Sequence, residues 1–178
     1  MSVLVEGHSV IVRCAAIHHR YAGGWEQFIA DVPNRTLCSD SEIVRVGFMS
    51  PADEQAYIGH LGRCGLRYCE NGTAVDLAAA FQLGGLKVPC DWLEFGRVYL
   101  DIGCASASVA CCRLQDGACM QLATPARWKY EGSLSQTFGI FPGAAANTGC
   151  KFLRHENGVD VYYDTLAGKE VFVGRTGE

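Results

Sequence analysis

The sequence predicts an α+β fold in which antiparallel β-strands dominate. Two-residue turn signals separate apolar runs at several places along the chain, and two helices with clear start and stop signals fall in the first half. From Cys90 onward the sequence shows strand patterns and no helical pattern. We therefore predict a mixed first half followed by an all-β second half rich in β-meanders.

The clearest helix is predicted over 51–64. Ser50 is placed to cap its start, Pro51 suits the first helical position, and Asp53 can complete a capping box. Gly65 is placed where a left-handed residue ends a helix. One face of this helix is apolar and consists of Tyr57, Ile58, Leu61 and Cys64.

The order of elements in the first half predicts a split βαβ arrangement of the ferredoxin-like kind. An earlier helix stops at Pro33, and its apolar face consists of Trp25, Phe28, Ile29 and Val32. The predicted order is strand 9–13, a helix ending near 32, strands 36–39 and 42–48, helix 51–64 and strand 66–70. The segment 73–83 fits either a helix capped by Thr73 or a strand returning from the turn at Asn71–Gly72, and we favour the strand.

Turn dipeptides organise the second half, at Asp116–Gly117 and Asn157–Gly158. The second of these turns places His155 opposite Asp160, Arg154 opposite Val161 and Lys151 opposite Asp164, which would pair opposite charges across the hairpin. We therefore interpret His155 as a structural partner of Asp160. The predicted strands cover 92–101, 108–114, 118–123, 127–131, 150–156, 159–164 and 169–174.

The length of 178 residues predicts one compact domain over 1–178. The glycines and the proline within 84–89 mark a possible boundary between two lobes, 1–88 (α+β) and 89–178 (all-β).

Ten cysteines stand out in the composition, and we interpret them as reduced thiols that act as small hydrophobic residues. Cys111 and Cys112 are adjacent in a predicted strand, so their side chains point to opposite faces and cannot bind one ion together. The turn at Asp116–Gly117 would place Cys112 opposite Gln121. No pair has the short spacing of zinc-binding cysteines, so we predict no metal site and no cofactor.

The charge distribution argues against nucleic acid as a partner. The formal net charge is −4, and the basic residues are scattered rather than gathered into a stripe. No apolar run is long enough to span a membrane, and the first residues lack the pattern of a secretory signal. We therefore expect a cytoplasmic protein without a membrane partner.

The segment 90–97 is the first candidate for a functional site. Asp91 and Glu94 lie among aromatic residues, which can raise the pKa of a carboxyl group and suit it to acid–base chemistry. Cys90 and two histidines elsewhere, His18 and His19, are candidates for assisting groups. The alternative interpretation is structural, because Glu94 and Arg97 can equally pair on a solvent-facing side of a strand.

The segment 124–149 is the second candidate. Trp128 and Tyr130 would share one strand face, with Arg127 on the other, and a long stretch with few strand signals follows. Together with Trp92 and Arg97, these residues could contact a ligand or a protein partner, since Trp, Tyr and Arg dominate binding hot spots. A core strand followed by a surface loop explains the segment equally well.

Two functions remain open from the sequence. The first is a non-enzymatic protein that acts through a protein partner or through self-association, because no known catalytic motif is present. The second is a small-molecule-binding protein or an enzyme, with a cleft between the two halves that uses acid–base carboxylates. A cavity in which Glu94, Trp128 and a histidine converge would favour the second function.

Overall fold

The computed structural model describes residues 1–102, 105–115, 121–137, 150–156, 159–164 and 169–174. It has an α+β fold with mostly antiparallel sheets, as predicted. The central layer is a five-stranded sheet in the order β3-β4-β2-β7-β8. These strands are β2 (His8–Arg13), β3 (Cys38–Ser39), β4 (Ile43–Phe48), β7 (Leu77–Phe81) and β8 (Gly85–Leu86).

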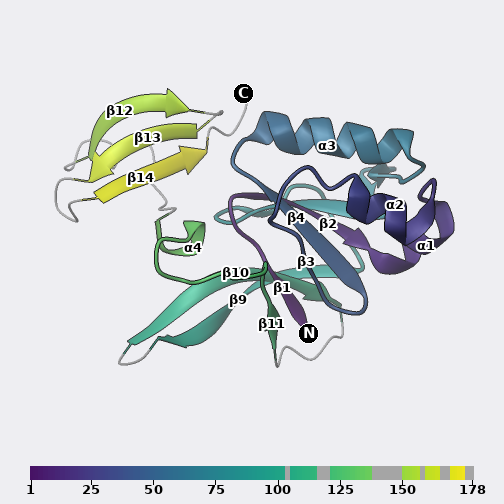
Figure 1. Cartoon of the computed structure of the whole chain (residues 1–178), viewed down its shortest axis with the longest axis horizontal. Helices are drawn as coiled ribbons and strands as arrows, with labels where there is room; N and C mark the ends of the chain where they lie inside the picture. Colours follow the sequence, from purple (N-terminus) through teal and green to yellow (C-terminus); the bar gives the residue numbers. More distant parts are fainter. Residues whose placement is uncertain (103–104, 116–120, 138–149, 157–158, 165–168, 175–178) are drawn as a thin grey trace.

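Helices cover one face of the central sheet (Figure 1). They are α1 (Cys14–Arg20), α2 (Gly24–Ala30) and α3 (Pro51–Arg63). Val10 and Val46 from the sheet pack there against Phe28 of α2 and Leu61 of α3, all of them buried. Burial of such apolar side chains is the main stabilising contribution to this layer.

The other face of the central sheet packs against a four-stranded sheet in the order β11-β1-β10-β9. Its strands are β1 (Ser2–Leu4), β9 (Leu93–Ile102), β10 (Ala105–Leu114) and β11 (Leu122–Ala123). Ile11, Ile43 and Ala78 of the central sheet meet Leu4 and Val109 in this second core. Because β1 pairs with β10 and β11, the first strand of the chain belongs to the sheet of the second half.

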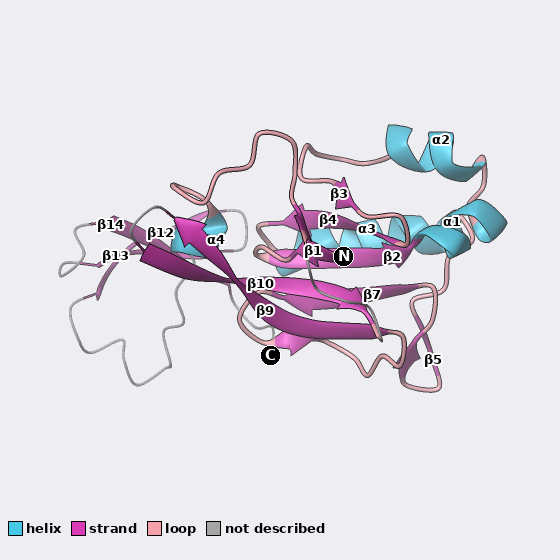
Figure 2. Ribbon diagram, turned by 90° about the horizontal axis from the view of Figure 1, so that it is seen from below, coloured by secondary structure: helices cyan, strands magenta, loops and turns pink. Residues whose placement is uncertain are grey.

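Two smaller sheets complete the fold. The hairpin of β5 (Cys69–Glu70) and β6 (Thr73–Ala74) turns at Asn71 and Gly72, which both have a positive φ, as the sequence predicts. β12 (Cys150–Glu156), β13 (Val159–Asp164) and β14 (Lys169–Gly174) form an antiparallel sheet at one end of the molecule (Figures 1 and 2). The short helix α4 (Leu134–Thr137) precedes it in the chain.

The helix predictions are largely confirmed. Ser50 caps α3 by accepting a hydrogen bond from the Asp53 amide, and Gly65 beyond its end has a φ of 105°. In α2, Phe28 is fully buried, but the predicted inward position of Ile29 is wrong, because its side chain is 41% exposed. The sequence analysis did not predict α1.

In the central sheet, strands that are connected through helices are not neighbours. The chain runs from β2 to β3 through α1 and α2, and from β4 to β7 through α3. β4 lies between β2 and β3, and β2 lies between β4 and β7. The predicted last strand of this unit, 66–70, is wrong, since β7 takes that place and β5 pairs only with β6. The preference for strand over helix in 73–83 is confirmed by β6 and β7. The ferredoxin-like topology itself stays a prediction.

Several strand predictions in the second half hold and others do not. β9, β10, β12, β13 and β14 match predicted strands. Cys112 lies opposite Val3 and Phe95, so its predicted pairing with Gln121 is wrong; the turn at Asp116–Gly117 lies outside the described residues. The segment 127–131 forms turns rather than a strand.

The β12–β13 hairpin keeps the predicted register only near its turn. Arg154 lies opposite Val161 and His155 opposite Asp160, as predicted. A bulge between Phe152 and Arg154 shifts the rest by one residue, so Lys151 lies opposite Tyr163 and its predicted pairing with Asp164 is wrong. Residues 157–158, the predicted turn, lie outside the described residues.

No helix within the described ranges combines the length and the apolar character that crossing a membrane requires.

A buried polar cluster joins α3 to the central sheet. Glu54 of α3 is fully buried and forms an ion pair with Lys87, just beyond β8. The Lys87 ammonium also lies 3.1 Å from Nδ1 of His8, and the His8 ring stacks on Phe81. Since an ammonium only donates, Nδ1 is the acceptor and His8 is neutral.

Acidification is expected to weaken the fold through His8. Burial, and then the charge of Lys87, lower the His8 pKa from 6.5 to about 4 in the folded protein. Between pH 6.5 and about 4, His8 is protonated in the unfolded chain but stays neutral in the folded protein. The contribution of His8 is therefore complete above pH 6.5, falls as the pH drops toward about 4, and changes no further below that.

Urea unfolding of the wild type and of His8→Asn at pH 7 and pH 5 measures this contribution. The wild type should lose about 1–2 kcal/mol more than the variant over that interval. The wild type must be compared with His8→Asn because Glu54 lies beside His8 and also titrates. Burial raises the pKa of Glu54, so its contribution to stability increases as the pH falls, opposite to that of His8. An equal loss in both proteins would contradict the assignment to His8.

Candidate functional site

A cavity of about 880 Å³ lies where the two halves of the chain meet. The first half contributes the segment 33–36, the end of β4 and the exposed side of α3, and the second half contributes 125–128 and Leu134. Pro33, Phe48, Met49 and Trp128 give it apolar walls. Its size is that of cavities that bind small molecules.

The wall contributed by the second half is held to the first half by hydrogen bonds. The Glu6 carboxylate accepts from the amide and the hydroxyl of Ser135, at 2.8 and 2.6 Å. The Gln82 side chain donates to the Leu134 carbonyl at 3.1 Å and accepts from the Gly7 amide. These bonds connect residues more than 50 positions apart and fix the α4 end of the cavity.

The three carboxylates that line the cavity are already bound within the protein. Glu6 is held by Ser135, and Asp53 accepts from the Ser50 hydroxyl at the start of α3. Asp31 accepts from the Tyr21 hydroxyl and from Gln27, each at 2.8 Å. The hydrogen bond from Tyr21, followed by that from Gln27, lowers the pKa of Asp31, so this carboxyl is ionised at neutral pH.

Two of the three arginines that line the cavity have fewer partners than the carboxylates. Arg35 and Arg127 are exposed, and no ion pair or hydrogen bond of their guanidinium groups is found within the described ranges. Arg127 also has a φ of 64°, a conformation that side chains disfavour and that often occurs at functional positions.

Arg45 is a buried cation at the same cavity. It is 1% exposed and donates to the Ser9 hydroxyl and to the carbonyls of Glu6 and Thr36. These partners are neutral groups, so burial is the largest effect on Arg45 and lowers its pKa. Cys38 and the nearby Glu6 carboxylate act in the opposite direction and favour the charged form of Arg45.

Two buried donors at the cavity have no partner among the described residues. They are the hydroxyl of Tyr57 and Nε1 of Trp128. Tyr57 is only 5% exposed, and burial raises the pKa of its hydroxyl, which therefore keeps its proton. Both atoms are themselves shielded from solvent, so a ligand in the cavity would reach them only after a shift of the side chain.

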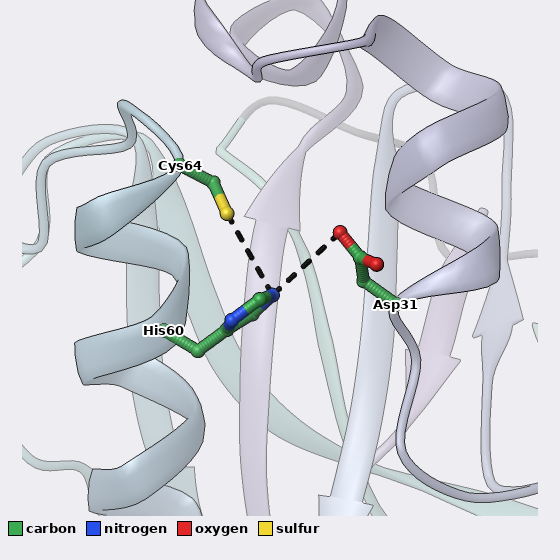
Figure 3. Close-up of side chains that lie close together, drawn as sticks. All are labelled: Asp31, His60 and Cys64. Atoms are coloured by element: carbon green, nitrogen blue, oxygen red, sulfur yellow. Dashed lines mark hydrogen bonds and ion pairs between the residues drawn. The ribbon is translucent and has the colours of Figure 1, made fainter.

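At one end of the cavity, Asp31, His60 and Cys64 converge (Figure 3). Asp31 follows the last residue of α2, His60 lies in the last turn of α3, and Cys64 is the C-terminal cap of α3. Nε2 of His60 lies 3.7 Å from both Cys64 Sγ and Asp31 Oδ2, and the Tyr21 hydroxyl is 3.2 Å from the same nitrogen. One nitrogen, one oxygen and one sulfur therefore face a common point.

The acid–base residues predicted from the sequence do not converge. His18 and His19 are exposed on α1, where His18 stacks on Trp25. Glu94 is exposed and forms an ion pair with Arg113 at 2.8 Å rather than with Arg97. Asp91 is exposed and Cys90 is half-buried with a raised pKa, chiefly because of burial. None of these five candidates lines the cavity.

The predicted contact residues lie in different parts of the structure, and two of them line the cavity. Arg127 and Trp128 line the cavity. Trp92 is buried and donates to the Ala74 carbonyl at 3.1 Å. Tyr130 packs against the core between the sheets, and exposed Arg97 donates to the Gln82 carbonyl at 3.3 Å.

The sequence analysis missed Asp31, Arg45, Tyr57 as a cavity residue, His60 and Cys64. One signal was present for the last two, because His60 and Cys64 are four positions apart on a predicted helix and so share a face. No local signal connects them to Asp31, which reaches them through the packing of α2 beside α3.

Comparison of the chain with protein-family models, curated proteins and solved structures finds no match in any of the three.

Proposed function

We propose that this protein binds a small organic anion in the cavity between its two halves. The second function open from the sequence was a small-molecule-binding protein or an enzyme with a cleft that uses acid–base carboxylates; the proposal keeps the small molecule and the cleft but rests on arginines. The observation that carries it is the pair of exposed arginines, Arg35 and Arg127, which line one cavity of about 880 Å³ and whose guanidinium groups have no partner among the described residues.

The balance of unsatisfied groups favours a negative ligand. Each lining carboxylate accepts hydrogen bonds from the protein, whereas Arg35 and Arg127 are without such bonds in the described part of the chain. The donor atoms of Tyr57 and Trp128 are fully buried, so the two arginines are the donors that face the cavity. A carboxylate, sulfonate or phosphate ester would satisfy this set, since guanidinium groups bind oxyanions well.

The apolar walls favour a ligand that also has a hydrophobic body. Phe48, Met49 and Trp128 lie on the same cavity as the arginines. Removal of their surface from water would add to the binding free energy, while the charged group would fix the orientation of the ligand.

The anionic dye anilinonaphthalene sulfonate is a suitable probe because it combines an aromatic body with one negative charge and fluoresces in apolar sites. We expect saturable binding of one dye per chain, and Arg127→Ala should weaken it about tenfold or more. Lys129→Ala is the matched control, because Lys129 is an exposed cation two residues away that does not line the cavity.

A neutral dye of the same shape, phenylnaphthylamine, separates charge from hydrophobicity. It should bind more weakly than the sulfonate and should respond little to Arg127→Ala. Equal binding of both dyes, or equal losses in Arg127→Ala and Lys129→Ala, would overturn the proposal of an anion site.

Self-association is a second candidate, and one observation favours it. β9 is ten residues long and lies at the edge of its sheet, where Tyr99 is 78% exposed. Edge strands of this length can pair with a second chain. A dimer by native mass spectrometry that Tyr99→Lys converts to monomer would support this candidate, and a wild-type monomer would reject it.

A further inference from the structure

We propose that Asp31, His60 and Cys64 bind a zinc ion with three protein ligands and one open position. The three ligand atoms all lie within 4.8 Å of one another. The proposal does not depend on the anion site, because the metal can bind whether or not the cavity holds a ligand.

The distances already approach those of a tetrahedral centre. Zinc binds histidine nitrogen and carboxylate oxygen at about 2.0–2.2 Å and thiolate sulfur at about 2.3 Å, which places the ligand atoms about 3.4–3.6 Å apart. The two distances from His60 Nε2, to Sγ and to Oδ2, are both 3.7 Å. The third distance, between Sγ and Oδ2, is within 4.8 Å, so closing the triangle around a zinc ion requires a movement of about 1 Å at most.

The types of ligand atom select zinc over magnesium or calcium. Those two ions prefer oxygen ligands, whereas zinc accepts nitrogen, oxygen and sulfur together. Three protein ligands with a vacant fourth position are typical of zinc sites that bind water or a substrate. Asp31 and His60 both line the cavity, and the Tyr21 hydroxyl, 2.8 Å from Asp31 Oδ2 and 3.2 Å from His60 Nε2, borders the fourth position.

The arrangement does not fit a cysteine nucleophile activated by a histidine–aspartate pair. Such a triad uses one histidine nitrogen for the nucleophile and the other for the carboxylate. Here Cys64 and Asp31 both approach Nε2 of His60 (Figure 3). Convergence on one nitrogen is the geometry of shared coordination.

Neighbouring groups already orient the carboxylate ligand. The Tyr21 hydroxyl donates to Oδ2 of Asp31, and Gln27 donates to Oδ1. Hydrogen bonds of this kind hold metal ligands in place and strengthen metal binding. A bound zinc ion would also place a positive charge beside the cavity, since Asp31 and His60 both line it.

The test uses the full chain, stripped of metal with a chelator and kept reduced. Titration with Co²⁺, which replaces zinc and reports its ligands, should give one ion per chain and a thiolate-to-cobalt charge-transfer band in the near ultraviolet. Zn²⁺ should displace it stoichiometrically. Cys64→Ala should abolish the band, and His60→Ala and Asp31→Ala should each weaken binding by at least about tenfold.

Cys69→Ala is the matched control, because Cys69 is an exposed thiol beyond the end of α3 and outside the cluster. It should leave the band and the affinity unchanged. Persistence of the band in Cys64→Ala, or loss of it in Cys69→Ala, would overturn the proposal, since other cysteines would then be the ligands.

A measurement on the wild type covers the case in which Cys64→Ala does not fold. Zn²⁺ should protect Cys64 from alkylation while Cys69 stays reactive, as read by mass spectrometry of peptides. Equal labelling of Cys64 with and without Zn²⁺ would reject the site. Dye binding that is unchanged in Cys64→Ala, with the cobalt band lost, separates this proposal from the anion site.

Discussion

Replacing Lys87 with methionine is expected to destabilise the protein by about 3–5 kcal/mol. Lys87 is the ion-pair partner of Glu54, whose side chain is fully buried between α3 and the central sheet. Without the ammonium, the folded protein must hold an unpaired carboxylate away from water or protonate it. Burial already raises the pKa of Glu54, and the charge of Lys87 opposes that increase.

The second substitution Glu54→Gln should recover more than half of this loss. It removes the buried charge and replaces it with a neutral amide of nearly the same shape. Buried ion pairs are often replaced by neutral groups with little net effect, although removal of one partner alone is severe. Recovery in the double variant would therefore show that the unpaired charge causes the loss.

Urea unfolding at neutral pH measures each variant. Lys129→Met is the control, because Lys129 is exposed and its replacement should change the free energy of unfolding by less than about 0.5 kcal/mol. A loss of similar size in Lys87→Met and Lys129→Met would contradict the assigned role of Lys87.

The burial of Glu54 shows which part of a buried site can be predicted from the sequence. Glu54 lies three, four and seven positions before Tyr57, Ile58 and Leu61, so it occupies the apolar face of α3. That position was visible in the sequence, but acidic residues in a first turn also suit the helix dipole, and local patterns do not decide between the two. The partner that permits burial, Lys87, is 33 positions away.

The fold class was predictable because its signals are local. Caps, turn dipeptides and alternation each act within a few residues, and they located α3, the β5–β6 hairpin and the long strands of the second half. The errors concern long-range pairing. Val3 lies opposite Cys112, and a strand of three residues at the start of the chain has no local feature that selects this partner.

The site was less predictable for the same reason. The predicted candidates at 90–97 were chosen because carboxylates and aromatic residues are close in sequence, yet in β9 such neighbours point to opposite faces. The cavity instead combines Asp31, Arg45, His60 and Arg127 from separate elements. Arg127 and Trp128 were singled out beforehand, because tryptophan and arginine are typical of binding hot spots and a long stretch with few strand signals follows them.

Arg45 illustrates the limit most clearly. Alternation with Val44 and Val46 would normally place such a residue on a solvent-facing side of a strand. In the structure Val44 and Val46 face the helices, and the second sheet covers the opposite face, where Arg45 and Ile43 lie. Burial of a strand on both faces can be predicted only when the layer that covers the second face is known. The sequence of the strand alone does not show that layer.

The position of Arg45 depends on Gly47, so Gly47→Ala is expected to destabilise the protein by about 2–4 kcal/mol. A Cβ at Gly47 would lie 2.6 Å from Cζ and 2.9 Å from Nη1 of Arg45, closer than side chains approach. The guanidinium has little room to move, because it is buried and bound to Ser9, Thr36 and Glu6.

Coupling between the two residues provides the decisive measurement. Arg45→Met should also destabilise the fold, since it leaves buried acceptors without donors. In the double variant the clash disappears, so its loss should be smaller than the sum of the two single losses by at least about 1 kcal/mol. Additive losses would mean that the clash with the Arg45 guanidinium is not the cause of the loss in Gly47→Ala.

Gly59→Ala in α3 is the matched glycine substitution. Its Cβ would meet only the end of Arg63, at 3.7 Å, and alanine favours a helix, so a gain of about 0.5–1 kcal/mol is expected. Arg45 also lines the cavity, and a guanidinium displaced by Gly47→Ala should change the affinity for the anionic dye as well. A loss of stability without any change in dye affinity would place Arg45 in the core alone and remove it from the proposed anion site.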